Sequence, residues 1–384
     1  MSAAKLTPPR VDLVGRLDAK SAFSQINLTL LELLEASGRW AVGHRSGPSA
    51  KSTASPPDLT IWQDWEDDFA SAQTPTTGKL AAIRPWDFGP YPPTWAEKIR
   101  RDCDELWIHS SWTRQLALRS GVPSEHIRVI PLGVDCDRFC PEGDPMALPS
   151  QCRSFRFLFA GATVRRKGFD IAVDAFLEAF DPGEDVCLVV KDRTDGVFYS
   201  GQQGVDARLR LEPYVEAGNV AFVHEHLPID DLAALYRACD VLVLPYRAEG
   251  FALTAAEAMA CGTPCLVPRF GACLDYCDDD NALFVSPRRI CLPVAREIAY
   301  NTLGFTAKVD EVDFCEVPVE VLTRRMREIF EHGKQDLRAR GVLAAETIRT
   351  RFSLGSMARN LDEAIDSLVS GRARRGRGQV ETLR

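Results

Sequence analysis

Short apolar segments alternate with longer amphipathic segments along this chain, in two successive series. Residues 186–190 (Val-Cys-Leu-Val-Val) and 241–244 (Val-Leu-Val-Leu) typify the short segments. Strands are apolar at every position when helices cover both faces of their sheet. Two strand–helix series therefore predict an α/β chain with two doubly wound, Rossmann-like domains. Ligands of such sheets bind beyond the C-terminal ends of the strands, so a cleft between the two domains is the expected site.

The first series occupies residues 11–130. Its expected strands are 11–14, 40–42, 59–62, 80–83, 105–108 and 127–130, and its expected helices are 21–36, 95–103 and 111–120. Phe23, Ile26 and Leu30 give the first helix an apolar stripe at helical spacing. Ser110 or Ser111 is the expected N-cap of the helix at 111–120.

A Pro-rich stretch at 139–149 separates the two series and is the expected domain boundary. In the second series the expected strands are 155–159, 186–190, 220–223, 241–244, 264–267 and 282–285, and the expected helices are 169–180, part of 207–217, 232–238, 254–261 and 356–368. Residues 288–317 fit neither pattern. The predicted divisions are therefore 1–140, 141–352, a last helix at 353–370 and a tail at 371–384.

The charge of the chain excludes some partners. Its net charge of −8 gives no reason to expect nucleic-acid binding. The tail at 371–384 differs, because five Arg against one Glu give it a charge of +4. We expect a solvated, disordered tail, and the alternative is a peripheral contact with anionic lipid.

The twelve cysteines do not form a metal-binding pattern. Several pairs are four residues apart, but no Cys-x-x-Cys occurs, and Cys187 lies in an apolar strand. The His-Glu-His sequence at 224–226 lacks further ligands at zinc spacing, so a loop against a nucleobase is expected there and no metal. Reduced cysteines, no apolar run of ~18 residues and no signal peptide predict a cytoplasmic protein.

A basic loop follows the first strand of the second series. Residues 159–168 read Phe-Ala-Gly-Ala-Thr-Val-Arg-Arg-Lys-Gly. Gly161 permits a tight turn, and Arg166 and Lys167 place cations beside the start of the next helix. Arg and Lys neutralise a diphosphate without a metal. The alternative is a solvated basic loop.

Two glutamates eight residues apart mark the loop after strand 241–244. Glu249 follows the strand, and Glu257 lies in the Ala-rich helix that comes next. A helix start presents free N–H groups and the positive end of its dipole to an anion. The expected backbone donors are Phe251, Ala252, Leu253 and Thr254. The alternatives are a helix-start acid for Glu249 and a buried structural pair for Glu257.

These motifs together resemble the donor site of the retaining GT-B glycosyltransferases of family GT4. The resemblance covers the Glu-x7-Glu segment at 245–264, the basic loop, and the segment 129–139 that enters the family's interdomain linker. It is strong from about residue 105 to 283 and weaker before residue 80. It implies a GT-B fold whose last helix returns to the first domain.

The resemblance also implies an activity. Members of the family move a sugar from a nucleotide diphosphate without a metal and keep the anomeric configuration. By this likeness Lys167 contacts the donor diphosphate, Glu249 the sugar hydroxyls and Glu257 the ribose. We therefore expect hexosyl transfer from a UDP- or GDP-linked donor to an unknown acceptor, which could be a glycan, a lipid-linked molecule or a protein.

The chain departs from the family at several positions. Ala162 stands where many members have the Arg of a Gly-Arg pair, and Arg165 or Arg166 could substitute. Ala252 replaces a glycine, and only Gly15 remains of the family's Gly-Gly loop after the first strand. The usual first-domain His is missing near 84–89, where Asp87 or Trp86 is the candidate contact to sugar or acceptor.

The alternatives to a transferase are a non-catalytic module that binds nucleotide sugar or a partner, and a sugar-nucleotide epimerase. His109 is a second first-domain candidate, for which a capping or core role is expected.

Overall fold

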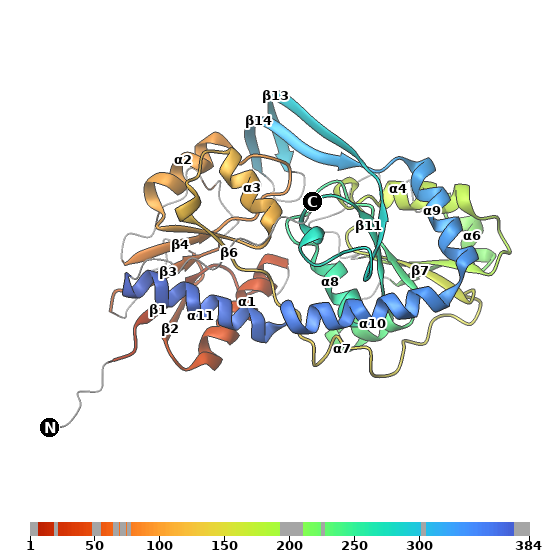
Figure 1. Cartoon of the computed structure of the whole chain (residues 1–384), viewed down its shortest axis with the longest axis horizontal. Coiled ribbons are helices and arrows are strands. Elements are labelled where there is room, and N and C mark those ends of the chain that lie inside the picture. The colour runs from red at the N-terminus through yellow and green to blue at the C-terminus, as the bar shows by residue number, and fades with distance from the viewer. Residues whose placement is uncertain are drawn as a thin grey trace.

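The computed structural model of the chain describes residues 7–18, 22–47, 55–63, 69, 74, 78–192, 210–223, 227–300 and 305–371. The described residues form two α/β domains that lie side by side, each built on a parallel sheet with helices packed around it (Figure 1). The predicted fold class is therefore confirmed. Residues 224–226 and 372–384, which carry the His-Glu-His sequence and most of the basic tail, lie outside the described residues.

The described part of the first domain contains six parallel strands and three α-helices. They are β1 (Arg10–Val14), α1 (Ala22–Ser37), β2 (Ala41–Arg45), β3 (Leu59–Trp62), β4 (Lys79–Ile83), α2 (Pro93–Asp102), β5 (Glu105–Ile108), α3 (Ser111–Arg119), a short 3-10 helix η1 (Ser124–His126) and β6 (Ile127–Val129). The strand order is β2-β1-β3-β4-β5-β6. Every residue of β3 and β5 is buried, as continuously apolar strands require. Ser110 caps α3 by accepting a hydrogen bond from the Thr113 N–H.

The second domain repeats this design. Its elements are β7 (Phe155–Ala160), η2 (Arg165–Lys167), α4 (Phe169–Ala179), β8 (Val186–Lys191), α6 (Glu212–Glu216), β9 (Val220–Val223), α7 (Ile229–Arg237), β10 (Val241–Val243), α8 (Leu253–Ala260), β11 (Cys265–Pro268), η3 (Ala272–Asp275) and β12 (Leu283–Val285). The strand order is β12-β11-β10-β7-β8-β9, so β7 and β10 are neighbours. Because the strands are parallel, the loops that leave β7 and β10 meet at one edge of the sheet.

The unassigned residues 288–317 form a long antiparallel hairpin. Its strands are β13 (Arg288–Tyr300) and β14 (Phe305–Glu316), with an irregular register between Pro293 and Arg296. The hairpin leaves the second domain and lies against the first (Figure 1), where Val309 and Val312 join the buried core around Trp86 and Trp95. The sequence did not predict it because its stability comes from packing on another domain.

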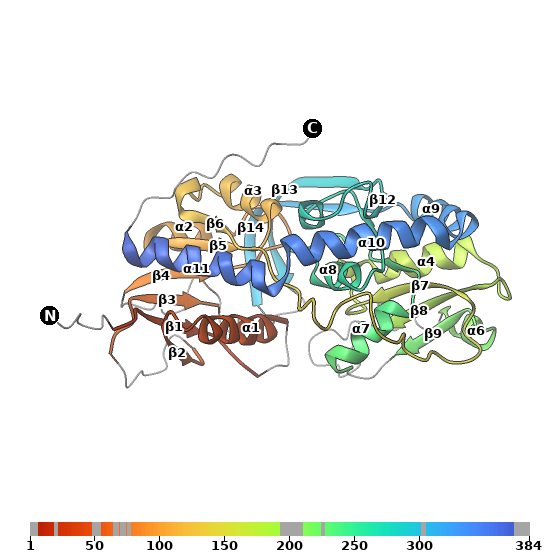
Figure 2. The same ribbon diagram turned by 60° about the horizontal axis from the view of Figure 1, so that its bottom comes forward.

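Three further helices follow within the described residues: α9 (Val319–His332), α10 (Lys334–Arg351) and α11 (Leu354–Ser370). Helices α10 and α11 run end to end along both domains (Figure 2). Helix α11 packs beside α1, and Asp362 accepts a hydrogen bond from the Trp40 indole at 2.8 Å. The structure therefore places the last helix on the first domain.

Two backbone segments cross between the domains at the same point. The Val134 N–H donates to the Phe352 carbonyl at 2.8 Å, and the Leu354 N–H donates to the Val134 carbonyl at 2.9 Å.

Among the helices that the structure describes, none combines the length and apolar character needed to cross a membrane.

Candidate active site

The basic loop and the Glu249 loop meet at the C-terminal ends of β7 and β10. Gly168 has a φ of +75°, a left-handed conformation that favours glycine. A Cβ at this position would lie 2.0 Å from the Pro245 carbonyl oxygen. In addition, the Arg247 N–H donates to the Arg166 carbonyl at 2.8 Å. The backbone after β10 therefore holds the basic loop in position.

Glu249 lies between the two predicted cations. Its carboxylate Oε1 is 2.6 Å from Lys167 Nζ and 2.7 Å from Arg166 Nη1, and the residue is 7% exposed. Burial raises the pKa of Glu249, but Lys167 and Arg166 outweigh this effect and hold it below its usual value. The carboxylate is therefore ionised at neutral pH.

Asp87 reaches the same place from the first domain. Its carboxylate Oδ2 lies 3.3 Å from Arg166 Nη1. A Cβ on Gly250 would lie 2.8 Å from Asp87 Oδ1, so only glycine leaves room for this approach. Two carboxylates and two cations thus meet at the boundary between the domains, and their charges sum to zero.

The N-terminus of α8 opens directly beside Glu249. Ala252 is its N-cap and, within the described residues, the one non-glycine with positive φ, at +64°. The Tyr276 hydroxyl lies 2.9 Å from the carbonyl oxygens of both Phe251 and Ala252. The first N–H groups of a helix have no acceptor within it, so Leu253 and Thr254 offer donors and the positive dipole end at this point.

Glu257 lies one turn further along α8 in a different environment. It accepts a hydrogen bond from the Tyr236 hydroxyl at 3.0 Å. Burial raises the pKa of Glu257 to about 7, against the opposing effects of the Tyr236 hydrogen bond and the more distant Lys167. The two glutamates of the motif therefore differ in their protonation at neutral pH.

Gly15 and His109 are held by first-domain neighbours. A Cβ on Gly15 would lie 2.1 Å from the Gln63 carbonyl oxygen, and the Gly15 N–H donates to the Arg45 carbonyl at 2.9 Å. His109 is buried and donates from Nδ1 to the Ile130 carbonyl at 2.9 Å, since a carbonyl can only accept. Burial lowers the pKa of His109 to about 4. The structure thus gives His109 a neutral, buried position.

Gly161 begins the basic loop with a φ of +144°. The position where its Cβ would stand is 3.9 Å from Lys167 Cδ, so the Lys167 side chain passes over this glycine. A Cβ at residue 161 would be in ordinary van der Waals contact with the lysine, so the positive φ is the reason that glycine is favoured there. The structure therefore brings together Gly161, Arg166, Lys167, Glu249 and the start of α8, with Asp87 from the other domain.

Arg247 also organises the site, although the sequence interpretation gave it no role. Its guanidinium is buried and makes bidentate ion pairs with Asp170 and Glu316. It also donates to the Arg165 carbonyl at 2.5 Å. Arg247 thereby joins the basic loop, α4 and the base of the hairpin. The available sequence signal was an arginine shortly after an apolar strand. It did not reveal the partners of this arginine, which are 77 and 69 residues away.

Ser110 is a second contributor that the sequence interpretation left as a helix cap alone. Its hydroxyl donates to the Gly250 carbonyl at 2.8 Å and so ties α3 of the first domain to the Glu249 loop. Nothing in the sequence distinguishes a serine that only caps a helix from one that also contacts the other domain.

One cluster of potential metal ligands occurs among the described residues, formed by Cys291, Glu311 and Asp313. Arg119 pairs with both carboxylates, and Arg289 pairs with Asp313 at 2.5 Å. Two guanidinium groups thus already supply the positive charge that a cation would bring. The cluster is an ion-pair network between the hairpin and α3.

Comparison with known proteins identifies the class of this fold. Residues 154–299 match the sequence model of the family described as glycosyl transferases group 1. The chain is 32% identical over 192 residues to the D-inositol 3-phosphate glycosyltransferase of Arthrobacter sp. (strain FB24), a match that covers 46% of this chain and 44% of that protein. The chain thus spans less than half the length of this curated relative.

Solved structures extend the likeness to both domains. A glycosyltransferase from Rickettsia africae ESF-5 has a TM-score of 0.71 at 13% identity, covering 96% of this chain and 100% of that one. Anabaena HepE in complex with UDP and glucose has a TM-score of 0.65 at 13% identity, covering 94% and 100%. The two facing parallel sheets are thus a GT-B fold. In its second domain, the chain is similar over residues 154–299 to the glycosyl transferases group 1 family.

Proposed function

We propose that this protein transfers a hexose from a nucleotide diphosphate sugar to an acceptor hydroxyl, with retention of the anomeric configuration. The observation that carries the proposal is the convergence of Arg166, Lys167, Glu249 and the start of α8 at the ends of β7 and β10. Breaking the sugar–phosphate bond places negative charge on the leaving diphosphate. Donors aimed at that charge stabilise the transition state more than the ground state.

Each group has a distinct part in this proposal. Lys167, Arg166 and the backbone N–H groups of residues 251–254 hold the diphosphate, with Gly161 leaving room beside them. Glu249 accepts hydrogen bonds from the sugar hydroxyls, and Glu257 accepts from the ribose. The similar HepE structure is a complex with UDP and glucose, which supports a UDP-linked donor for this protein.

The charge of the site supports coupling between donor binding and domain movement. Asp87 belongs to the first domain, whereas Arg166, Lys167 and Glu249 belong to the second. Separation of the domains removes Asp87 from Arg166 and leaves the second-domain groups with a net charge of +1. A diphosphate is then attracted to the exposed cations, and Asp87 approaches the sugar or the acceptor when the domains close again.

The acceptor in this proposal binds between Asp87 and the donor sugar. The name of the Arthrobacter relative includes a phosphorylated inositol, which supports trying cyclitol and sugar phosphates first. Because two cations and the start of α8 face the diphosphate in this proposal, we propose that the reaction needs no metal. EDTA should then leave the rate unchanged.

The test begins with a thermal-shift screen of UDP- and GDP-linked sugars, because a donor that binds the native state raises its thermal midpoint. Hydrolysis and transfer are then measured with the donor found. Lys167→Ala should weaken donor binding and turnover together. Glu249→Gln should keep or tighten binding of the free nucleotide diphosphate, since it releases two cations, and should lower turnover by roughly 10²-fold or more.

Matched controls lie on the surface of each domain. Lys79→Ala removes an exposed lysine paired with Asp104, and Glu346→Gln removes an exposed helix acid. Both should behave as the wild type. Full turnover in Glu249→Gln would contradict the site assignment, and tight donor binding without turnover on any acceptor would favour a binding module.

A further inference from the structure

Two cysteines of the second domain lie in contact at the end of the sheet opposite to the candidate active site. Cys152 precedes β7, and Cys187 is the second residue of the neighbouring strand β8. Their sulfur atoms are 2.8 Å apart. Sulfurs in a disulfide lie about 2.05 Å apart, so a small movement suffices to join them. Both residues carry free thiols.

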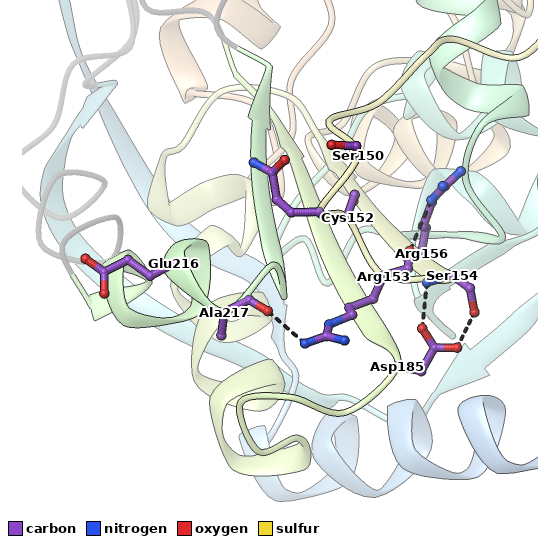
Figure 3. Close-up of a pocket in the computed structure, with 9 residues that line it drawn as sticks. Ser150, Cys152, Arg153, Ser154, Arg156, Asp185, Glu216 and Ala217 are labelled. Atoms are coloured by element: carbon purple, nitrogen blue, oxygen red, sulfur yellow. Dashed lines mark hydrogen bonds between the residues drawn. The ribbon is translucent and has the colours of Figure 1, made fainter.

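A hollow of about 560 Å³ gives access to Cys152 of this pair. It is lined by the segment 150–154 together with Arg156, Asp185, Glu216 and Ala217. Figure 3 shows Cys152 on the wall of this hollow, next to Arg153, whose guanidinium donates to the Ala217 carbonyl at 3.0 Å. Cys152 is partly exposed, whereas Cys187 is fully buried. A small oxidant can therefore reach Cys152 first.

The electrostatic surroundings of the two thiols also favour Cys152 as the more reactive one. The hydrogen bond with Cys187 lowers the pKa of Cys152 to about 7, and the Arg156 guanidinium adds to this effect against the cost of burial. The pKa of Cys187 is raised by the same hydrogen bond and by burial. Cys152 is consequently the partner that ionises more readily to the thiolate, which is the reactive form of cysteine.

We propose that Cys152 and Cys187 form a redox-sensitive pair that a hydroperoxide converts to an intrachain disulfide. The Cys152 thiolate attacks one oxygen of hydrogen peroxide, the O–O bond breaks, and a sulfenic acid and hydroxide form. The Cys187 sulfur then attacks the Cys152 sulfur. The S–O bond breaks, and the hydroxyl group leaves with the Cys187 proton as one water. The hydroxide from the first step takes up the proton that Cys152 released on ionising and becomes the second water. Two thiols are oxidised and one peroxide is reduced to two waters.

The new bond would have a structural consequence. Residues 152 and 187 are 35 positions apart, so the disulfide closes a loop that contains β7, the basic loop and α4. Closing such a loop restricts the unfolded chain. Oxidation should therefore raise the thermal midpoint, and a thiol reductant should reverse the rise. This inference does not depend on the proposed transferase activity.

The experiment treats the reduced full-length protein with a small excess of hydrogen peroxide, blocks the remaining thiols with N-ethylmaleimide and measures the intact mass. Wild-type protein should carry two adducts fewer than the untreated sample, and peptide mapping should join Cys152 to Cys187. Cys152→Ser and Cys187→Ala should each lack this linkage and the rise in thermal midpoint. Cys291→Ser, which removes an exposed cysteine elsewhere, should keep both.

Three outcomes would overturn the proposal: full alkylation of the treated wild type, a linkage that maps to other cysteines, or direct conversion of Cys152 to sulfinic acid. Cys152 is the partly exposed partner, so its serine variant keeps the test valid even where the core substitution at Cys187 impairs folding.

Discussion

At the scale of single residues, the two glutamates of the motif show how position alters chemistry. Glu249 has Lys167 and Arg166 within hydrogen-bonding distance, and its pKa is lowered despite burial. Among the residues that the structure describes, Glu257 has the neutral Tyr236 hydroxyl at such a distance, and burial raises its pKa to about 7. Burial costs a carboxylate its hydration, and nearby cations compensate only Glu249.

The Glu257→Gln variant should show the cost of this burial. The pKa of Glu257 is raised from 4.5 to about 7, so the native state retains a proton that the unfolded state releases. The free energy of unfolding therefore falls as the pH rises from about 4.5 to about 7. Glutamine does not titrate, so the variant should gain stability relative to the wild type over this window, by on the order of 1–3 kcal/mol at pH 8.

Urea denaturation at pH 5 and pH 8 measures this difference, with the exposed Glu346→Gln as the control. Equal pH dependence in the wild type and Glu257→Gln would show that Glu257 is ionised at no cost.

Gly168 tests how firmly the basic loop is held. Alanine at this position would be strained by the φ of +75° and would place its Cβ 2.0 Å from the Pro245 carbonyl oxygen. Gly183→Ala is the matched control, because Gly183 has a φ of +99° with no atom within 4 Å of its Cβ position. The control should lose about 1–2 kcal/mol from backbone strain alone, and Gly168→Ala should lose clearly more in urea denaturation. Equal losses would mean that the loop moves freely away from Pro245.

At the scale of elements, α3 and the hairpin β13–β14 join the two domains. Trp112 of α3 packs on Phe270 with ring centroids 4.6 Å apart, and the Ser111 N–H donates to Asp275 Oδ2 at 2.7 Å. From the other side, the Asp313 N–H of the hairpin donates to the Phe88 carbonyl at 2.8 Å. Phe88 follows Asp87 directly, so the hairpin supports the segment that carries the first-domain candidate residue.

Asp313→Asn should weaken this support. The Asp313 carboxylate is fully buried and pairs with Arg119 and Arg289. Burial raises the pKa of Asp313, but these two cations outweigh it and the net shift is downward. Loss of the charge-assisted hydrogen bonds should lower the free energy of unfolding at pH 7 by about 1.5–3 kcal/mol.

The exposed Asp310 on the same strand provides the control Asp310→Asn, which should leave stability unchanged. Chemical denaturation of both variants measures their free energies of unfolding. Equal stability of the two would show that the ion pairs of Asp313 do not stabilise the contact between the hairpin and the first domain.

At the scale of the whole molecule, the domains are joined where two chain crossings pair through Val134, Phe352 and Leu354. Gly133 packs tightly in this crossing, because a Cβ there would lie 2.8 Å from Leu354 Cα and 3.0 Å from Leu354 N. Any rotation of one domain against the other therefore has to bend or shift the two chain segments at this contact.

Gly133→Ala should therefore destabilise the chain by about 1–3 kcal/mol, since backbone atoms must shift. Gly355→Ala is a control at the same crossing, where the new Cβ would meet only side-chain atoms at 3.7 Å and beyond. Alanine is the better helix former, so this control should gain about 0.5–1 kcal/mol. Thermal and urea unfolding of the two variants measure the expected loss and the expected gain of stability. A Gly133→Ala variant as stable as the wild type would show that the crossing is loosely packed.

Local pattern predicted the elements of both sheets because each strand–helix unit carries its own apolar periodicity. The helix predicted at 111–120 is α3, for which Ser110 and not Ser111 is the cap, and the strands predicted at 59–62 and 105–108 are β3 and β5. The hairpin was missed because its strands are stabilised by first-domain side chains far away in the sequence. Arg247 was missed for the same reason.

The sequence alone determined the class of the fold and marked the basic loop and the two-glutamate segment, because apolar periodicity and helix-start chemistry act within short stretches of chain. Tertiary structure decided which charges meet. It placed Asp87 beside Arg166, Glu249 between two cations, and Glu257 beside the Tyr236 hydroxyl. It also placed Cys152 against Cys187. Electrostatic energy depends on distances of a few ångströms and on burial, and both are set only when separate strand ends and separate domains pack together.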